Sequence, residues 1–280
     1  MSYPHHRRDA YRSNFTYVSP CVKYLIFLLN FIFWLFGGLL IGIGMYAFVD
    51  KWQVIGWIRL ETVYDVILNV SLVMVIMGAV VFIVSFAGCV GALRENTCLL
   101  KFYSVCLLMF FLIEMGIAIM IFIYPHSIQT LLENNFTDKI IETYRDDPDL
   151  QNFIDFAQQE FQCCGLSSEG YMDWSKNEYF NCSSPSVERC GVPFSCCTND
   201  PNAPLVNIMC GYGAQTLSIA EAGKKIWTSG CIEIVRSWAE GNLYAIAGVA
   251  LGVALAQLFV IYLSKTLEGQ IELQKSRWAS

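Results

Sequence analysis

Residues 24–49 read YLIFLLNFIFWLFGGLLIGIGMYAFV and contain no aspartate, glutamate, lysine or arginine. Three further stretches are similar: 66–93 and 241–264 have no charged residue, and 102–124 has only Glu114. An α-helix needs about 20 apolar residues to cross the hydrocarbon core of a bilayer. The sequence therefore predicts an all-α membrane protein with four transmembrane helices.

Composition supports membrane insertion. Of 280 residues, 55% are hydrophobic and 15% are charged, an apolar share that a soluble domain of this length does not need. Buried helices of a large soluble core are the alternative, but nothing amphipathic flanks the four stretches. The first stretch begins too late and is too long for a cleavable signal peptide, so we expect it to remain as a signal anchor.

Basic residues set the expected orientation. Nine lysines and arginines lie beside the spans in the two tails and the turn between spans two and three, against Lys51 and Arg59 in the loop opposite. By the positive-inside rule both termini are cytosolic and the long loop is outside. This divides the chain into a cytosolic tail (1–23), span one (24–49), a small outer loop (50–65), span two (66–93), a cytosolic turn (94–101), span three (102–124), a large outer loop (125–240), span four (241–264) and a cytosolic tail (265–280).

The large outer loop holds eight of the twelve cysteines: Cys163, Cys164, Cys182, Cys190, Cys196, Cys197, Cys210 and Cys231. An even number in an exported segment predicts a disulfide framework. Zinc is disfavoured because the loop has no C-x-x-C and only one histidine, His126. Two doublets stand out, and adjacent cysteines rarely bond to each other because their Cα atoms are only about 3.8 Å apart. Spacing alone leaves the pairing open.

Two glycosylation sequons fall in the large loop, at Asn135 and Asn181. We expect both to be glycosylation-competent. Two more, at Asn14 in the cytosolic tail and Asn69 in a span, we interpret as chance matches.

Helices should frame the loop. One apolar face recurs every four residues at Ile128, Leu132, Phe136, Ile140 and Tyr144. Asp147-Pro148 is typical of an N-cap followed by proline at the first helical position. A second apolar stripe follows at Leu150, Phe153, Ile154, Ala157 and Phe161, and a third helix is expected through Cys231, Val235 and Trp238 into span four.

Between the doublet at 163–164 and about residue 223, glycine, proline, serine and asparagine are frequent and periodicity is lost. Irregular surface loops of this kind tend to carry recognition. The alternative is that this insert only caps the helices, but a cap would not need three further bridges. The loop has 16 acidic and 7 basic residues, a net charge of −9, which excludes nucleic acid as a partner.

Polar residues and thiols also occur at the membrane. Asn30, Glu114 and Gln257 lie inside spans, where such groups need partners. Asn30 and Gln257 share a depth and could hydrogen-bond, whereas interhelical bonding is the favoured reading of Glu114. Cys21, Cys89 and Cys98, at the cytosolic ends of the first three spans, are candidates for S-palmitoylation. Glycine pairs at 38/42 and 248/252 have a G-xxx-G spacing that suits close helix packing.

Several motifs resemble those of one family. CCG at 163–165 and PFSC at 193–196 lie in the long outer loop, LIFLLNFIFWLFGG lies in span one, and AGCVGALREN ends span two. Together they resemble the tetraspanins, from about residue 18 to residue 264. Eight loop cysteines, YRDDPDLQNFIDF before the first doublet, and ERCGVPFSCC followed by NIMCGYG resemble the eight-cysteine subgroup of that family.

The resemblance implies four bridges: Cys163–Cys231, Cys164–Cys196, Cys182–Cys190 and Cys197–Cys210. It also implies a sterol-holding cavity between the spans, with polar residues at Asn30 and Gln257. Family members often have glutamate where this chain has Gln257. Acylation at juxtamembrane cysteines and lateral association with other tetraspanins are further family traits that it implies.

Three functional classes compete. The resemblance favours a non-enzymatic organiser that binds an ADAM-type transmembrane metalloprotease and promotes its exit from the endoplasmic reticulum, its activity at the plasma membrane and its action on substrates such as Notch. A channel or a lipid-binding four-span protein is the alternative, but one acidic residue in four spans is little for an ion pathway. An enzyme is disfavoured because no nucleophile motif or metal set is present. The sequence implies no cofactor.

Overall fold

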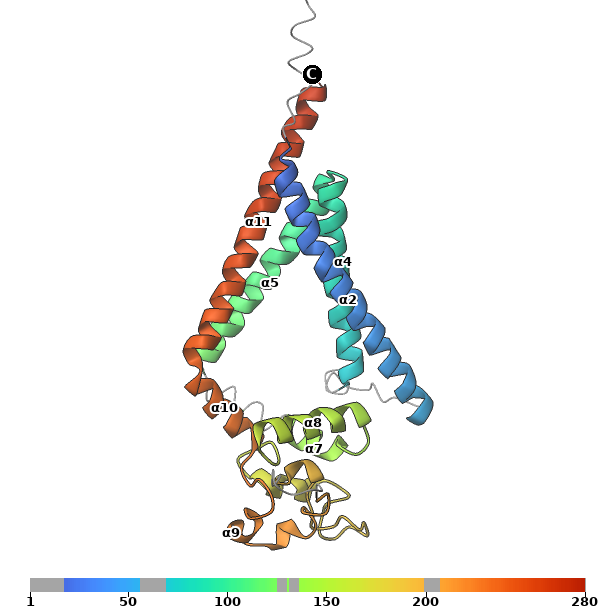
Figure 1. Ribbon diagram of the computed structural model, residues 1–280, viewed down its shortest axis with the longest axis vertical. Helices are drawn as coiled ribbons and strands as arrows, with labels where there is room; N and C mark the ends of the chain where they lie inside the picture. Colours follow the sequence, from blue (N-terminus) through green and yellow to red (C-terminus); the bar gives the residue numbers. More distant parts are fainter. Residues whose placement is uncertain (1–17, 56–68, 125–129, 131–135, 199–206, 280) are drawn as a thin grey trace, which may run out of the picture. The chain divides into compact units, whose positions relative to one another are not determined.

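The computed structural model describes residues 18–55, 69–124, 130, 136–198 and 207–279, and these ranges are mostly helical, without a named β-strand (Figure 1). Four helices are long and apolar enough to cross a membrane: α2 (Pro20–Ile55), α4 (Val70–Leu93), α5 (Thr97–Ile123) and α11 (Leu243–Ala279). A helix satisfies its backbone polar groups internally, as hydrocarbon requires. The predicted fold class is confirmed.

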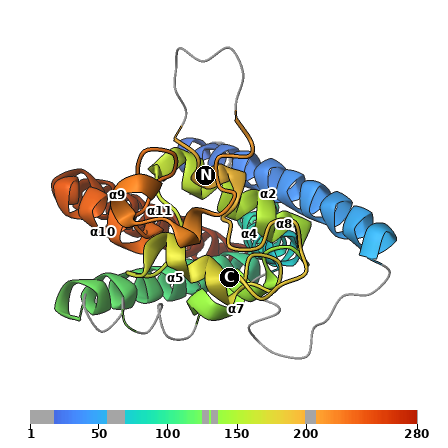
Figure 2. The ribbon, with the colours of Figure 1, turned by 90° about the horizontal axis from the view of Figure 1, so that it is seen from below.

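The remaining helices are short and lie between α5 and α11 along the chain (Figure 2). They are α7 (Asp138–Thr143), α8 (Pro148–Phe161), α9 (Ile219–Ala222), α10 (Cys231–Gly241) and three 3₁₀ turns, η2 (Gly170–Lys176), η3 (Phe194–Cys196) and η4 (Ala214–Thr216). A single non-helical residue, Asn242, separates α10 from α11. The expected third loop helix therefore stops just before span four instead of running into it.

The chain forms two compact units. One, the span unit, comprises 1–43, 74–117 and 250–280; the other, the outer-loop unit, comprises 44–73 and 118–249. Each long helix thus contributes its two ends to different units.

In the span unit, α2 and α4 pack through glycine. A Cβ atom on Gly37 would lie 2.8 Å from the backbone nitrogen of Phe82, and one on Gly78 would lie 2.9 Å from the backbone nitrogen of Ile41. Only hydrogen fits at such a contact. Of the G-xxx-G pairs predicted from the sequence, only Gly38 faces α4, where a Cβ would lie 3.7 Å from the ring of Phe82. Gly42, Gly248 and Gly252 have no described atom within 4 Å of such a Cβ.

The end of the span unit that holds the last turns of α11 has its own core. Helix α11 does not stop at Ser264 but continues to Ala279, and its residues Leu267 and Ile271 are buried. They pack in one cluster with Leu263 of the same helix, with Ile26 of α2, Ala92 of α4 and Leu100 of α5, and with Val18, which precedes α2. The sequence assigned no structure to this tail, which is instead a packed helix.

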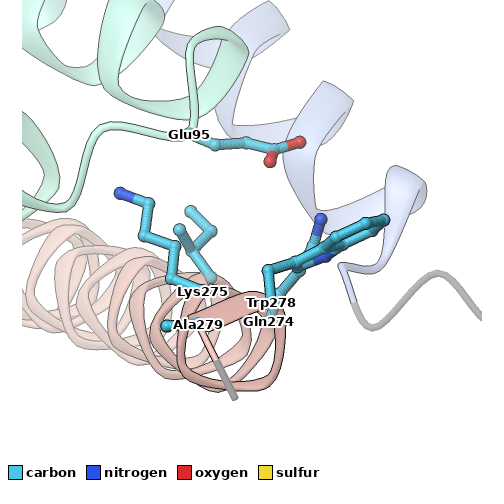
Figure 3. A pocket seen from close by; sticks show the side chains of 6 residues that line it. Glu95, Gln274, Lys275, Trp278 and Ala279 are labelled. Atoms are coloured by element: carbon cyan, nitrogen blue, oxygen red, sulfur yellow. The ribbon is translucent and has the colours of Figure 1, made fainter.

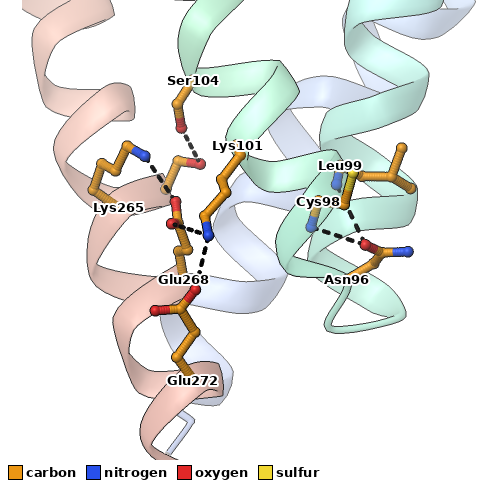
Figure 4. A network of polar contacts seen from close by, with 9 residues as sticks. Asn96, Cys98, Leu99, Lys101, Ser104, Lys265, Glu268 and Glu272 are labelled. Carbon is orange, nitrogen blue, oxygen red and sulfur yellow. Dashed lines mark hydrogen bonds and ion pairs between the residues drawn. The ribbon is translucent and has the colours of Figure 1, made fainter.

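Polar contacts surround this core (Figure 4). Lys101 of α5 lies 3.0 Å from Glu272 and 3.6 Å from Glu268 of α11, and the hydroxyls of Ser104 and Ser264 are 2.9 Å apart. The side chain of Asn96 accepts from the backbone nitrogens of Cys98 and Leu99 and so caps α5. Charged pairs therefore involve three long helices at this end of the unit, because Lys23 of α2 also pairs with Glu95 at 2.8 Å.

The outer-loop unit is built on an aromatic core. Trp174, Tyr144 and Phe180 are each at most 1% exposed, and the rings of Tyr144 and Trp174 meet edge to face with centroids 4.7 Å apart. Around them lie Ile141, Leu150, Ile154, Val192 and Ile226. This core gives α7 and α8 a common buried side, consistent with the apolar faces expected there.

Helix α8 starts as the sequence predicts, but only part of its predicted apolar stripe is buried. Asp147 is its N-cap, with its carboxylate accepting from two backbone nitrogens, and Pro148 is its first residue. Leu150 and Ile154 are buried, but Phe153 is 56% exposed. The apolar stripe predicted from the sequence is therefore wrong at Phe153.

We predict that Gly37→Ala lowers the thermal stability of the full-length protein in mild detergent, because the added methyl group meets the backbone of α4. Gly42→Ala is the matched control, on the same helix with open space around it. There alanine should be neutral or stabilising by about 0.5–1 kcal/mol from helix propensity. Equal loss in both variants, measured by thermal unfolding, would contradict the assigned contact.

Candidate partner-binding surface

Four disulfides shape the outer loop, and each doublet sends its sulfurs in two directions. Cys163 is bonded to Cys231, at Cα–Cα 5.0 Å, and Cys164 to Cys196, at 4.9 Å. The other two bridges are Cys182–Cys190 and Cys197–Cys210. These are the four pairs that the resemblance implies. The first ties the end of α8 to the start of α10, and the second ties the same point to η3.

The turn after the first doublet depends on Gly165. Its φ is +74°, and a Cβ there would lie 1.9 Å from the carbonyl oxygen of Gly170. The carboxylate of Asp173, which is fully buried, accepts from the backbone nitrogens of Leu166 and Ser167 at 2.8 and 2.7 Å. The sequence reasoning missed Asp173. Its only signal was an aspartate in a glycine- and serine-rich segment, where a carboxylate commonly accepts from turn N–H groups.

A buried polar network joins α8 to the rest of the loop. The hydroxyl of Tyr144 donates to Asp155 at 2.6 Å. The hydroxyl of Ser195 lies 2.6 Å from the same carboxylate and 2.7 Å from Gln158, and its single proton serves one acceptor at a time. Burial, together with the negative charge of Asp155, raises the pKa of Tyr144. The inward face of α8 is therefore specified by polar residues as well as by Leu150.

The insert also has a groove of about 300 Å³. An ion pair between Arg145 and Glu188 borders it, and the guanidinium lies 5.5 Å from the centre of the Phe180 ring. The other lining residues are Gly191, Val192, Phe194, Ile208, Met209 and Tyr212. Ile208 and Met209 are 66% and 62% exposed. The groove thus presents apolar side chains to solvent around one fixed ion pair.

Of the two expected glycosylation sites, the structure describes Asn181. Asn181 is half-buried, and its amide nitrogen donates to the carbonyl of Ser175 at 2.8 Å. Its amide oxygen accepts from the backbone and hydroxyl of Ser183. Asn135 lies outside the described residues, as does Asn14. Asn69, taken from sequence to lie within a span, instead directly precedes α4, and its side chain accepts from Leu72.

The expected intramembrane pair does not form. Asn30 is 3% exposed and donates to the carbonyl of Ile26 and to the hydroxyl of Tyr103, at 2.9 and 3.0 Å. The side-chain oxygen of Gln257 is buried with no hydrogen-bond partner in the described part of the chain. Glu114 is half-buried in α5. Sequence reasoning missed Tyr103, because a tyrosine in a span gives no distinct signal.

The three candidate acylation sites have different surroundings. Cys21 and Cys98 are exposed. Cys89 is buried, and its thiol donates to the carbonyl of Phe27 at 3.7 Å. The structure therefore leaves two of the three thiols open to an acyltransferase without local rearrangement.

A second hollow, of about 390 Å³, lies in the span unit beside the last turns of α11 (Figure 3). Glu95 from the turn between α4 and α5 faces residues of the last turns of α11: Ile271, Gln274, Lys275, Trp278 and Ala279. Glu95 already pairs with Lys23. The mixed lining of a carboxylate, an ammonium group and an indole does not define one class of ligand.

Comparison with known proteins gives evidence of family membership that is independent of the structure. The family model described as "Tetraspanin family" matches residues 22–269. Tetraspanin-33 of Bos taurus is 42% identical over 267 residues, covering 95% of this chain and 91% of the relative. Tetraspanin-33 of Homo sapiens is 41% identical, covering 93% and 89%. Tetraspanin-5 of Homo sapiens is 44% identical, covering 93% and 96%.

We predict that the outer loop loses stability above about pH 10, the ordinary pKa of tyrosine. The folded loop holds Tyr144 protonated, so its contribution to stability is complete below that pH and is lost as pH rises towards the raised pKa. Tyr144→Phe should cost about 1 kcal/mol at pH 7 but should show a shallower alkaline decline. Urea unfolding of both proteins, followed by near-UV circular dichroism at several pH values, measures the difference. Parallel declines would contradict the role of Tyr144.

Proposed function

The chain belongs to the tetraspanin family of multi-pass membrane scaffold proteins, and from that premise we propose that it escorts an ADAM-type transmembrane metalloprotease. In this proposal the protein is not an enzyme. It binds the protease laterally, promotes its exit from the endoplasmic reticulum and its maturation, and so regulates ectodomain shedding and Notch signalling at the plasma membrane. Both termini are cytosolic, and the protein passes through the Golgi and endosomes in transit.

The observation that carries this proposal is the apolar groove on the disulfide-stapled insert between Cys164 and Cys231. Four bridges hold this insert, so little conformational entropy remains to be lost when a partner binds. Exposed apolar groups on such a rigid support are typical of a protein-binding surface. The eight loop cysteines, through the resemblance to the eight-cysteine subgroup, suggest an ADAM-type protease as the partner.

The chemistry of the groove suits a protein ligand. Protein interfaces concentrate their binding energy in a few apolar and aromatic anchors surrounded by polar groups. Here Phe194, Met209 and Tyr212 supply the anchors, and the Arg145–Glu188 pair supplies the polar border. The net charge of −9 on the loop favours a basic surface on the partner.

We predict that Ile208→Asp weakens co-purification of the protease in mild detergent by at least about tenfold, equivalent to ~1.4 kcal/mol, because a charge replaces an apolar anchor of the groove. The matched control is Ile219→Asp on α9, where the isoleucine is 70% exposed in the same insert and does not line the groove. It should bind normally. Maturation of the protease in cells is the second readout.

Two results would count against the proposal at different levels. If both variants retain the protease, the groove is not its site. Exchanging residues 165–230 for the insert of a four-cysteine tetraspanin then decides whether the insert contributes at all, since the chimera should reach the surface without maturing the protease. If the intact protein co-purifies with no such protease, the family assignment stands and the partner assignment fails.

Lipid is a second candidate ligand, and one observation favours it. The Gln257 oxygen in α11 and the indole N–H of Trp34 in α2 are a buried acceptor and a buried donor without described partners. A sterol hydroxyl can donate and accept, so it could satisfy either group. Asn30 and Glu114 belong to the same candidate site. Other tetraspanins are proposed as lateral partners, helped by acylation of Cys21, Cys89 and Cys98, and Asn135 and Asn181 as glycan carriers.

We predict that Gln257→Leu lowers labelling by a photoreactive sterol analogue in reconstituted vesicles, because the unpartnered oxygen is lost. Leu258→Met, at the adjacent and 43% exposed position, is the control that should label normally. Labelling that is unchanged in the Gln257 variant would remove this residue from any sterol site.

A further inference from the structure

The first turn of α8 is fixed to the outer ends of two membrane-spanning helices. Lys51, near the end of α2, forms an ion pair with Asp147, and both side chains are largely buried. The hydroxyl of Ser71, in the first turn of α4, donates to Asp149. Ser71 is 1% exposed. Because three of these four residues carry charge and the fourth, Ser71, is buried, this attachment is costly to break.

The attachment places α8 at the level of the membrane surface. Helix α4 has 24 residues, about 36 Å at 1.5 Å per residue, against a hydrocarbon core of about 30 Å. With Leu93 at the cytosolic end, Ser71 then lies at the outer boundary of the hydrocarbon core. Asp149, which is hydrogen-bonded to Ser71, lies at the same depth.

Two exposed phenylalanines share the face of Asp149. Positions 149, 153 and 156 are spaced i, i+4 and i+7 and so lie on one side of the helix. Phe153 and Phe156 are 56% and 64% exposed. They lie about 6 and 10 Å along the helix from Asp149, within reach of the headgroup layer. The neighbouring side, with Leu150 and Ile154 about 100° further around the helix, is buried in the loop core.

The charges of α8 select the kind of lipid. Its sequence, PDLQNFIDFAQQEF, has three acidic residues and neither lysine nor arginine. A surface that binds anionic headgroups would carry basic residues. Interfacial helices place phenylalanine at the boundary between headgroups and acyl chains. A face with two phenylalanines, one aspartate and no basic residue therefore fits electrically neutral, zwitterionic phospholipid.

We propose that the Asp149–Phe153–Phe156 face of α8 is a lipid-contact surface that rests in the headgroup region of the outer leaflet, on zwitterionic phospholipid. This goes beyond the proposed escort function, which uses the groove of the insert. The lipid contact would hold the loop at a defined height above the bilayer.

The test is photo-crosslinking of the full-length protein in phosphatidylcholine vesicles. The photoreactive phenylalanine analogue p-benzoylphenylalanine replaces Phe153 or Phe156, one at a time. In the control the same analogue replaces Ile219, because Ile219 is 70% exposed in the same unit but lies on α9. Mass spectrometry of the peptides should find a several-fold excess of phospholipid adducts at 153 and 156 over 219. Recovery of the Cys163–Cys231 peptide without reduction verifies the fold of each variant.

Three outcomes would overturn the proposal. Adducts to other peptides of this chain would mean that the protein itself covers the face. Adducts to another protein would mean that the face is a protein interface. Equal lipid yields at all three positions would mean that contact is nonspecific. Protease co-purification is measured on the same variants and should be unchanged, so failure of the escort function is distinguishable from failure of the lipid contact.

Discussion

Two cysteines that are adjacent in the chain cannot easily bond to each other, and the outer loop is organised by that restriction. At Cys163 and Cys164 the two sulfurs must leave the backbone towards different partners, so one point of the chain is joined both to the start of α10 and to η3. The turn that makes this possible needs Gly165 and the carboxylate of Asp173. Everything the insert presents to solvent is held by this branch point.

Asp147 illustrates how one residue can serve both local and long-range structure. Its carboxylate caps α8 by accepting from the backbone nitrogens of Asp149 and Leu150 and also pairs with Lys51. The cap follows from local sequence, because aspartate before proline is a common helix start. The ion pair joins residues far apart in the chain, and no local sequence pattern predicts it. The end of α2 and the outer loop therefore meet at a residue whose identity the cap alone would explain.

This difference between local patterns and long-range contacts also separates the features that the sequence predicts from those that it does not. The spans follow from uncharged length, and the disulfide framework from an even number of exported cysteines. The pairing itself needed the resemblance. Helical periodicity indicated an apolar face on α8 but could not tell that Asp155 would be buried by Tyr144 and Phe153 left exposed. It likewise could not choose Gly37 over Gly42, since both lie in one apolar helix and only the position of α4 separates them.

The Cys163–Cys231 bridge has a consequence for the time course of biosynthesis. Its two cysteines are 68 residues apart, which is roughly 3 to 14 s of translation at 5–20 residues per second. Through that interval Cys163 has no native partner, whereas the partners of Cys164, Cys182 and Cys197 are all made before Cys231. The last bridge to become possible is thus the one at the start of α10. Oxidative closure of the loop is therefore complete only when the last membrane helix is about to be made, so the order of synthesis itself delays the final shape of the loop until three of the four membrane helices are already in place.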